Sequence, residues 1–206
     1  MCGITGYINE ESVEQKKDTL QKMMDRIVHR GPSSAGMYVD EYAALGFRRL
    51  SIIDLEGGDQ PIYNETNDLI ITFNGEIYNY RALRQMLTEK GHIFKTNSDT
   101  ETILHGYEEF GKEVLHYLRG MFAFVIWDKK KLLFGARDHF GIKPLYYAYM
   151  NHTFLYASEI KSLLENPAFE KILNKDALRP YLTYQYSALD ETFFKGVFKL
   201  PEGHYF

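Results

Sequence analysis

The 206-residue chain contains a single cysteine, Cys2. One cysteine excludes an internal disulfide, which fits a protein of the reducing cytoplasm. The longest strongly apolar run, residues 120–127, is far too short to form a membrane-spanning helix. Because the first residues show no charged segment followed by an apolar one, they do not resemble a secretory signal peptide. We therefore expect a cytoplasmic protein that makes no use of a membrane.

Other absences narrow the class of function. Lys and Arg number 24 against 28 Asp and Glu, and no long cationic block occurs, so we expect no nucleic-acid partner. The seven histidines lack H-x-x-x-H spacing, and with one distant cysteine the sequence predicts no metal site. The chain has neither the pyrophosphate loop S-G-G-x-D-[ST] nor a P-loop, so we expect ATP and magnesium to bind elsewhere.

Bulky apolar side chains, in contrast, are abundant. Hydrophobic residues make up 45% of the chain and aromatic residues 15%, which is ample for a packed core. A length of 206 residues fits one domain, and no Pro/Gly/Ser linker or internal repeat divides it. We expect residues 1–206 to form a single domain.

The hydrophobic pattern predicts strands at both ends of the chain and helices between them. β-rich runs predict strands at residues 1–8, 36–40, 42–55, 69–74, 121–128, 131–138, 144–150 and 153–158. The runs at 36–40 and 42–55 predict a hairpin with a tight turn at Asp40 and Glu41, and the last four runs predict an antiparallel meander. Helical spacing and end signals predict helices at residues 10–31, 80–90 (capped by Asn79 and ended by Gly91), 100–110 (capped by Asp99 and ended by Gly111), 159–166 and 175–184. No strand-helix-strand rhythm is present, so the pattern predicts a layered α+β fold.

Cys2 directly follows the initiator methionine, which is commonly removed when the second residue is small. Removal would give Cys2 a free α-amine beside its thiol. A thiol of pKa about 8.5 needs a base to become a nucleophile, and an α-amine of pKa about 7.7–8.0 suits that task. A buried, unreactive cysteine is nevertheless the commoner fate of a free thiol. If Met1 stays, the amine is an amide and this mechanism fails.

Six motifs occur in one order along the chain. They are CGITGY at 2–7, HRGPSSAG at 29–36, RRLSIIDLEGGDQP at 48–61, FNGEIYNY at 73–80, SDTE at 98–101 and RDHFGIKPLYY at 137–147. The ordered set resembles the N-terminal glutaminase domain of the class II glutamine amidotransferases, which belong to the N-terminal nucleophile hydrolases. The resemblance covers essentially the whole chain and implies two mainly antiparallel sheets sandwiched between helices (αββα).

The motifs RLSIIDL, FNGEIYNY and GIKPLYY favour the asparagine synthetase branch of that family. One position departs from the branch, because Ser33 follows Pro32 where the branch usually has Asp. The glutaminase domain of another class II amidotransferase is therefore the alternative. The motif at 137–147 is interpreted as architectural, with Arg137 and Asp138 as alternative candidates for contact with a partner domain.

The resemblance implies a catalytic set. Cys2 would be the nucleophile, and Asn74 and Gly75 would form an oxyanion hole from an amide donor and an unhindered backbone N–H. Arg30 would lie behind Cys2, orient it and lower its thiol pKa, although a structural salt bridge is an equal interpretation. In isolation, the Asn-Gly pair would indicate only a turn.

The resemblance also implies a substrate-binding set. Arg49 would bind the α-carboxylate of glutamine through its planar fork, and Glu76 and Asp99 would hold the α-ammonium. Leu50 and Ile52 would line the substrate mainly through backbone groups. Without the resemblance, Arg49 and Glu76 would be solvated charges and Asp99 a helix cap.

The implied reaction hydrolyses glutamine to glutamate and ammonia through a Cys2 thioester, with no cofactor in this domain. The implied partner is a C-terminal synthetase domain, absent from this chain, which would use ATP and magnesium to make asparagine. The sequence leaves the oligomeric state open, a homodimer included. A noncatalytic module that binds glutamine or docks onto a synthetase is the rival hypothesis.

Overall fold

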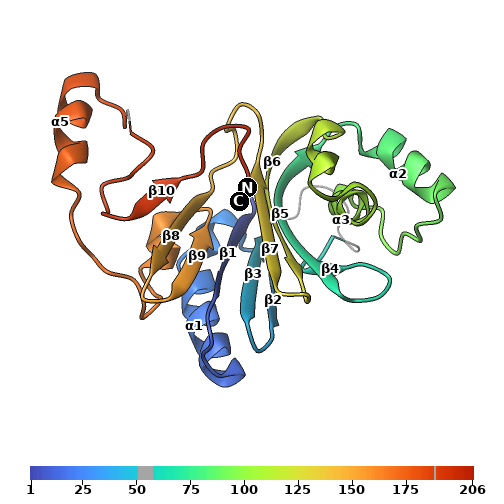
Figure 1. Cartoon of the computed structure of the whole chain (residues 1–206), viewed down its shortest axis with the longest axis horizontal. Helices are drawn as coiled ribbons and strands as arrows, with labels where there is room; N and C mark the ends of the chain where they lie inside the picture. The colour runs from blue at the N-terminus through green and yellow to red at the C-terminus, as the bar shows by residue number, and fades with distance from the viewer. Residues whose placement is uncertain (51–57, 188) are drawn as a thin grey trace.

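Two antiparallel sheets pack face to face with helices on both outer sides, as the computed structural model of residues 1–50, 58–187 and 189–206 shows (Figure 1). Among these residues the larger sheet has the strand order β10 (Val197–Lys199), β8 (Tyr146–Met150), β9 (Thr153–Ala157), β1 (Gly3–Ile8), β3 (Ala43–Arg49), β2 (Ser34–Val39). The smaller sheet has the order β4 (Ile62–Tyr63), β5 (Leu69–Ile77), β6 (Gly120–Asp128), β7 (Leu132–Arg137). The predicted layered α+β fold is confirmed.

Helices cover the outer face of each sheet. α1 (Val13–Asp25) and α4 (Ile160–Leu163) cover the larger sheet, and α2 (Tyr80–Glu89) and α3 (Asp99–Phe110) cover the smaller one. α5 (Lys175–Tyr184) projects away from both sheets (Figure 1), and η1 (Val28–Arg30) and η2 (Gly111–His116) are 3₁₀ turns. A capping box begins α1, because the side chains of Ser12 and Gln15 each accept the backbone N–H of the other. No helix within the described residues is long and apolar enough to cross a membrane.

Three apolar clusters separate the layers. Between the sheets, Ile4 and Phe47 of the larger sheet share a cluster with Ile70 and Val125 of the smaller one. A second cluster lies between the smaller sheet and helices α2 and α3. A third joins the larger sheet to α1 and α4. Since successive strand residues point to opposite faces, strands β5 and β6 contribute to two clusters at once.

Pairing between β1 and β3 brings the start of the chain next to the end of β3. The strands run antiparallel with Gly3 opposite Arg48, so Cys2 lies beside the end of β3 where Arg49 stands. The side chains of β5 alternate, with Ile71 and Phe73 in the cluster under the helices and Ile70 between the sheets. Asn74 therefore points to the sheet-sheet side, toward the start of β1.

The predicted four-stranded meander is wrong. β6 pairs with β7 in the smaller sheet, whereas β8 pairs with β9 in the larger one. The chain crosses between sheets after Arg137, whose buried guanidinium donates to the carbonyls of Lys143 (2.7 Å) and Leu200 (2.6 Å). The buried Asp138 carboxylate accepts the N–H groups of Phe122 and Lys143. Both side chains bond backbone groups of other parts of the chain, as the architectural interpretation predicts for these two residues.

Helix ends follow the prediction only in part. Gly91 and Gly111 end their helices with φ of 103° and 58°, a backbone region that favours glycine. The prediction that Asp99 caps a helix is wrong, because Ser98 is the cap residue and Asp99 is the first residue of α3. Asn79 does occupy the cap position of α2, but its side chain bonds the backbone of residues 117 and 119 instead of the helix.

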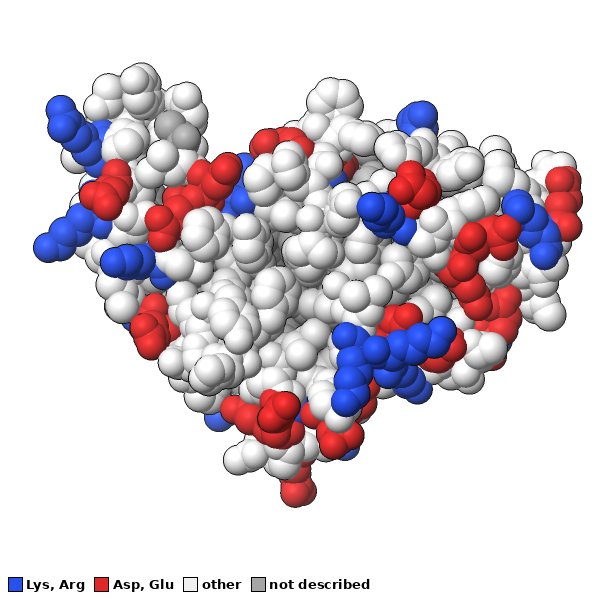
Figure 2. Space-filling model, viewed as in Figure 1, with Lys and Arg blue, Asp and Glu red and all other residues white. Residues whose placement is uncertain are grey.

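Charged side chains lie mainly toward the margin of the face shown in Figure 2, where acidic and basic residues are interspersed. The centre of that face is uncharged. One small group of adjacent basic side chains lies below and to the right of the centre, beside acidic ones.

Candidate active site

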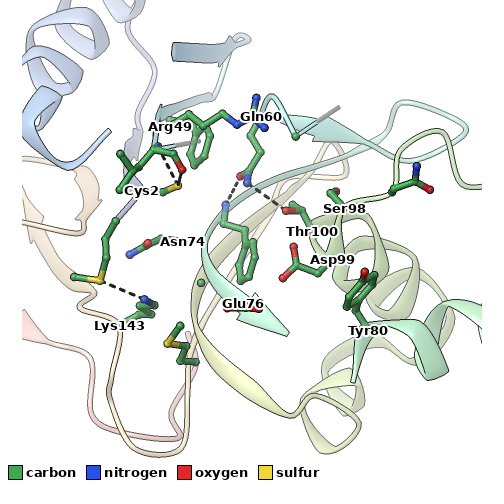
Figure 3. A pocket seen from close by; sticks show the side chains of 18 residues that line it. Cys2, Arg49, Gln60, Asn74, Glu76, Tyr80, Ser98, Asp99, Thr100 and Lys143 are labelled. Atoms are coloured by element: carbon green, nitrogen blue, oxygen red, sulfur yellow. Dashed lines mark hydrogen bonds between the residues drawn. The ribbon is translucent and has the colours of Figure 1, made fainter. Parts of the chain in front are cut away.

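A cavity of about 300 Å³ opens where the starts of β1 and α3 meet the ends of β3 and β5 (Figure 3). It is lined by Met1, Cys2, Phe47, Arg49, Leu50, Gly58, Gln60, Phe73, Asn74, Gly75, Glu76, Tyr80, Asn97, Ser98, Asp99, Thr100, Met121 and Lys143. Seven predicted residues are therefore brought together in one place: Cys2, Arg49, Leu50, Asn74, Gly75, Glu76 and Asp99. Ile52 lies outside the described residues.

Cys2 is held against the end of β3. Its Sγ lies 3.4 Å from the backbone nitrogen of Leu50, which donates to it, and 3.8 Å from the Leu50 carbonyl oxygen. Arg30 contacts Cys2 through the backbone, since its Nε donates to the Cys2 carbonyl at 2.9 Å. The same guanidinium pairs with Glu159 at 3.0 Å. Arg30 thus contacts the backbone of Cys2 and forms a salt bridge, and it does not line the cavity itself.

Met1 also lines the cavity, so in this chain the nitrogen of Cys2 is part of a peptide bond. The Met1 Sδ accepts a hydrogen bond from the Lys143 ammonium at 3.3 Å. Its side chain is half-exposed. Removal of Met1 would therefore both free the Cys2 amine and vacate space beside it.

Asn74 presents an amide nitrogen, Nδ2, that has no hydrogen-bond partner among the described residues. The residue is 1% exposed, and its Nδ2 is buried without a hydrogen bond. A buried polar group left unpaired costs about 1–3 kcal/mol, so such a group in a cavity wall is a natural place for a ligand to bind. Figure 3 shows this amide between Cys2 and Lys143.

Gly75 is required by close packing of β5 against β6. A Cβ at this position would lie 2.2 Å from the Met121 carbonyl oxygen and 2.8 Å from the Phe122 Cα. The sheet therefore leaves no room for any side chain at this position.

Charges of opposite sign lie in different parts of the cavity. The Arg49 guanidinium is buried, and one of its nitrogens pairs with Asp59 at 3.0 Å. Asp99 lies across the cavity from Cys2 (Figure 3), and its carboxylate accepts the Ile77 N–H at 2.8 Å. Burial raises the pKa of Asp99 above its ordinary value, and the nearby Glu76 carboxylate adds to that effect although the Ile77 N–H opposes it.

Two residues of the cavity wall, Gln60 and Lys143, were not predicted as site residues from the sequence. Gln60 ties β5 to α3, because its Oε1 accepts the Phe73 N–H at 2.6 Å and its Nε2 donates to Thr100 at 3.2 Å. Lys143 belongs to the motif interpreted as architectural, yet its side chain lines the cavity. Burial lowers the pKa of Lys143, and the positive charge of Arg30 lowers it further.

Two facing antiparallel sheets between helices, with a cysteine entering the first strand, define the N-terminal nucleophile hydrolase fold of amidotransferases. Solved structures agree. A glutamine phosphoribosylpyrophosphate amidotransferase from B. subtilis superposes with a TM-score of 0.64 at 23% identity, over 79% of this chain and 43% of that one. The allosteric regulatory enzyme of purine biosynthesis superposes with a TM-score of 0.67 at 25% identity, over 80% of this chain and 43% of that one.

The family model of the glutamine amidotransferase domain matches residues 1–206, and the chain belongs to this family. It is 46% identical over 210 residues to asparagine synthetase [glutamine-hydrolyzing] 1 of Bacillus subtilis, covering 100% of this chain and 33% of that protein. Over 170 residues it is 45% identical to asparagine synthetase B [glutamine-hydrolyzing] of Escherichia coli, covering 80% of this chain and 30% of that protein. The chain spans about a third of the length of these curated relatives.

Proposed function

We propose that this domain hydrolyses glutamine to glutamate and ammonia through a thioester on Cys2. The observation that carries the proposal is the unpartnered Asn74 amide in the same small cavity as the Cys2 thiol. A thiol nucleophile needs a donor where negative charge develops on the attacked carbonyl oxygen, and a preorganised buried amide meets that need. A volume of about 300 Å³ suits a small substrate.

The charges in the cavity support an amino-acid substrate. A zwitterion needs a cation for its α-carboxylate and a carboxylate for its α-ammonium, and Arg49 and the pair Glu76 and Asp99 supply them. Arg49 offers a planar fork that can bind a carboxylate through two hydrogen bonds. With the substrate's α-carbon held by these groups, its side-chain amide can extend to Cys2 and Asn74.

The reaction needs Cys2 as both nucleophile and base. After Met1 is removed, the Cys2 amine takes the thiol proton and the thiolate attacks the carboxamide carbon, forming a C–S bond and an oxyanion. Asn74 and the Gly75 N–H stabilise that oxyanion. Collapse breaks the C–N bond, and ammonia leaves with the proton returned by the amine. Water then hydrolyses the thioester to glutamate and regenerates the thiol.

We further propose that the ammonia passes to an ATP-dependent synthetase domain that makes asparagine in the cytoplasm, where ATP and magnesium would be used. The support is that relatives matched over 99–100% of this chain bear the name asparagine synthetase and are about three times its length. The test is asparagine formation from aspartate, ATP and glutamine by the full-length gene product. A different amide product would favour another class II amidotransferase.

Ammonia release from glutamine by the purified domain tests the hydrolase proposal. The domain should release ammonia and glutamate in equal amounts. The Cys2→Ala variant should release neither, and calorimetry should show that it still binds glutamine. Intact mass must first show that Met1 has been removed. Glutamine binding without any difference in ammonia release between the two proteins would favour the noncatalytic module and overturn the proposal.

A further inference from the structure

Two histidines and two glutamates converge at a second place, and none of them lines the cavity. Glu65 lies in the turn between β4 and β5, His92 follows α2, and His105 and Glu108 stand one turn apart on α3. One ligand atom from each lies within 4.8 Å of all the others. The cluster escaped the sequence search because its members come from three separate segments.

The carboxylates have one oxygen each held by the protein and one turned inward. Glu65 Oε1 accepts the Ile93 N–H at 2.8 Å, and Glu108 Oε1 accepts from Asn64 Nδ2 at 3.1 Å. The remaining oxygens, both Oε2, face His105 Nδ1 at 3.2 and 3.5 Å. His105 is 1% exposed, and neither of its ring nitrogens has a hydrogen bond of acceptable geometry. Glu65 Oε2 is likewise buried without one.

The spacing between these atoms is near that of a tetrahedral coordination shell. Nitrogen and oxygen ligands about 2.0–2.1 Å from a zinc ion lie about 3.3–3.4 Å from one another. His105 Nδ1 lies 3.2 Å from Glu65 Oε2 and 3.5 Å from Glu108 Oε2. His92 Nδ1 lies 3.8 Å from the same Glu108 oxygen and 3.6 Å from the other oxygen of Glu65, Oε1. Small side-chain movements would close all four atoms around one ion.

The outer nitrogen of each histidine faces a further carboxylate. His105 Nε2 lies 3.5 Å from Glu101 Oε1, and His92 Nε2 lies 3.5 Å from Glu109 Oε2. Glu101 is buried, and its Oε2 accepts the Thr96 N–H at 2.7 Å, so it is fixed in place. Metal-bound histidines commonly donate their second N–H to such a carboxylate, which sets the tautomer and orients the ring. Four carboxylates around two imidazoles also favour a bound cation.

We propose that Glu65, His92, His105 and Glu108 bind one divalent transition-metal ion, for which Zn²⁺ has the best-fitting geometry and ligand set. The ion would fasten the β4–β5 turn and the segment after α2 to α3. Because α3 begins at Asp99 in the cavity wall, the ion would stabilise the helix that positions this residue. Its role is structural, and the proposal does not depend on glutamine hydrolysis.

Cobalt is the probe for this site, because tetrahedral Co²⁺ has intense visible bands. The chelator-treated, dialysed domain should bind one equivalent of Co²⁺ with tetrahedral bands, and Zn²⁺ should displace it and raise the melting temperature. His92→Gln and Glu108→Gln, both partly solvent-accessible, should abolish the bands. Glu109→Gln should weaken binding by about 10–100-fold, as expected when the carboxylate behind a histidine ligand is lost. His116→Gln is the matched control, since His116 forms an exposed pair with Glu113.

The outcomes separate the site from adventitious binding. Absence of tetrahedral bands in the parent domain would overturn the proposal. So would bands that persist in both His92→Gln and Glu108→Gln, or bands lost equally in His116→Gln. Circular dichroism of each apo variant checks the fold, and the less buried Glu108→Gln still gives the test if His92→Gln does not fold.

Discussion

Replacing Asn74 by alanine is the most direct test of the oxyanion hole. The residue is 1% exposed and its Nδ2 has no partner in the described part of the chain, so Asn74→Ala leaves no acceptor there unpaired. Burying the unpaired amide destabilises the parent domain by about 1–3 kcal/mol, and alanine removes this penalty. That gain offsets part of the destabilisation caused by the small void that the substitution creates. We therefore expect a folded variant with a melting temperature close to that of the parent domain.

The effect on catalysis should be large and confined to the chemical step. Losing one oxyanion donor costs about 10²–10³ in kcat, equivalent to about 2.7–4 kcal/mol. Arg49, Glu76 and Asp99 would still hold the α-carbon of glutamine, so KM should change by no more than about twofold. Initial rates of ammonia release over a range of glutamine concentrations separate the two constants.

Thr72→Val is the matched control for this measurement. Thr72 lies two residues earlier on β5 and points to the same face, its hydroxyl is also buried without a hydrogen bond, and it does not line the cavity. Its kcat should equal that of the parent domain. A kcat for Asn74→Ala within about threefold of the parent, or an equal loss in Thr72→Val, would refute the assignment of Asn74 as the donor.

Three further predictions concern the base, the sheet and the ammonium site. Inserting a lysine between Met1 and Cys2, verified by intact mass, should lower ammonia release by about 10²-fold or more because the free amine is lost; full activity with the extension present would contradict the amine as base. Gly75→Ala should destabilise the domain by about 1–3 kcal/mol in urea unfolding, since a Cβ would lie 2.2 Å from a β6 carbonyl, and an unchanged midpoint would disprove this packing argument. The raised pKa of Asp99 means that its carboxylate loses charge at a higher pH than an ordinary aspartate, so KM for glutamine should rise early as the pH falls. Asp99→Asn should have a KM raised about tenfold at neutral pH and should lack this pH dependence; a parallel pH profile in both proteins would exclude Asp99 from ammonium binding.

Local signals in the sequence predicted most of the secondary structure. The hairpin of β2 and β3 was predicted from the turn at residues 40–41, and there Asp40 Oδ1 accepts two backbone N–H groups. Helix ends at Gly91 and Gly111 were predicted because positive φ favours glycine. The cap of α3 was misassigned because Ser98 and Asp99 are both residue types that favour helix caps. In the structure the Asp99 carboxylate accepts the backbone N–H of Ile77 in β5, a contact that no local pattern indicates.

The strand pairing was harder to predict. Four successive β-rich segments predict one meander. In the structure, the buried side chains of Arg137 and Asp138 stabilise a connection through which the chain passes from the smaller sheet to the larger one. Nothing local distinguishes such a crossing from an ordinary hairpin turn. Its signal is the set of hydrogen bonds that these two side chains make with distant backbone groups.

Ordered motifs in the sequence alone determined the family and the chemical identity of the candidate site, because a nucleophile, an amide donor and a fixed set of charges are properties of residue types. Only the tertiary structure placed Cys2, Arg49, Asn74 and Asp99 around one cavity. It also left the Asn74 amide without a partner and gathered the histidines and glutamates beside α3. The physical reason is that burial, pairing register and the facing of two sheets are set by contacts between residues far apart in the chain, which no local pattern records.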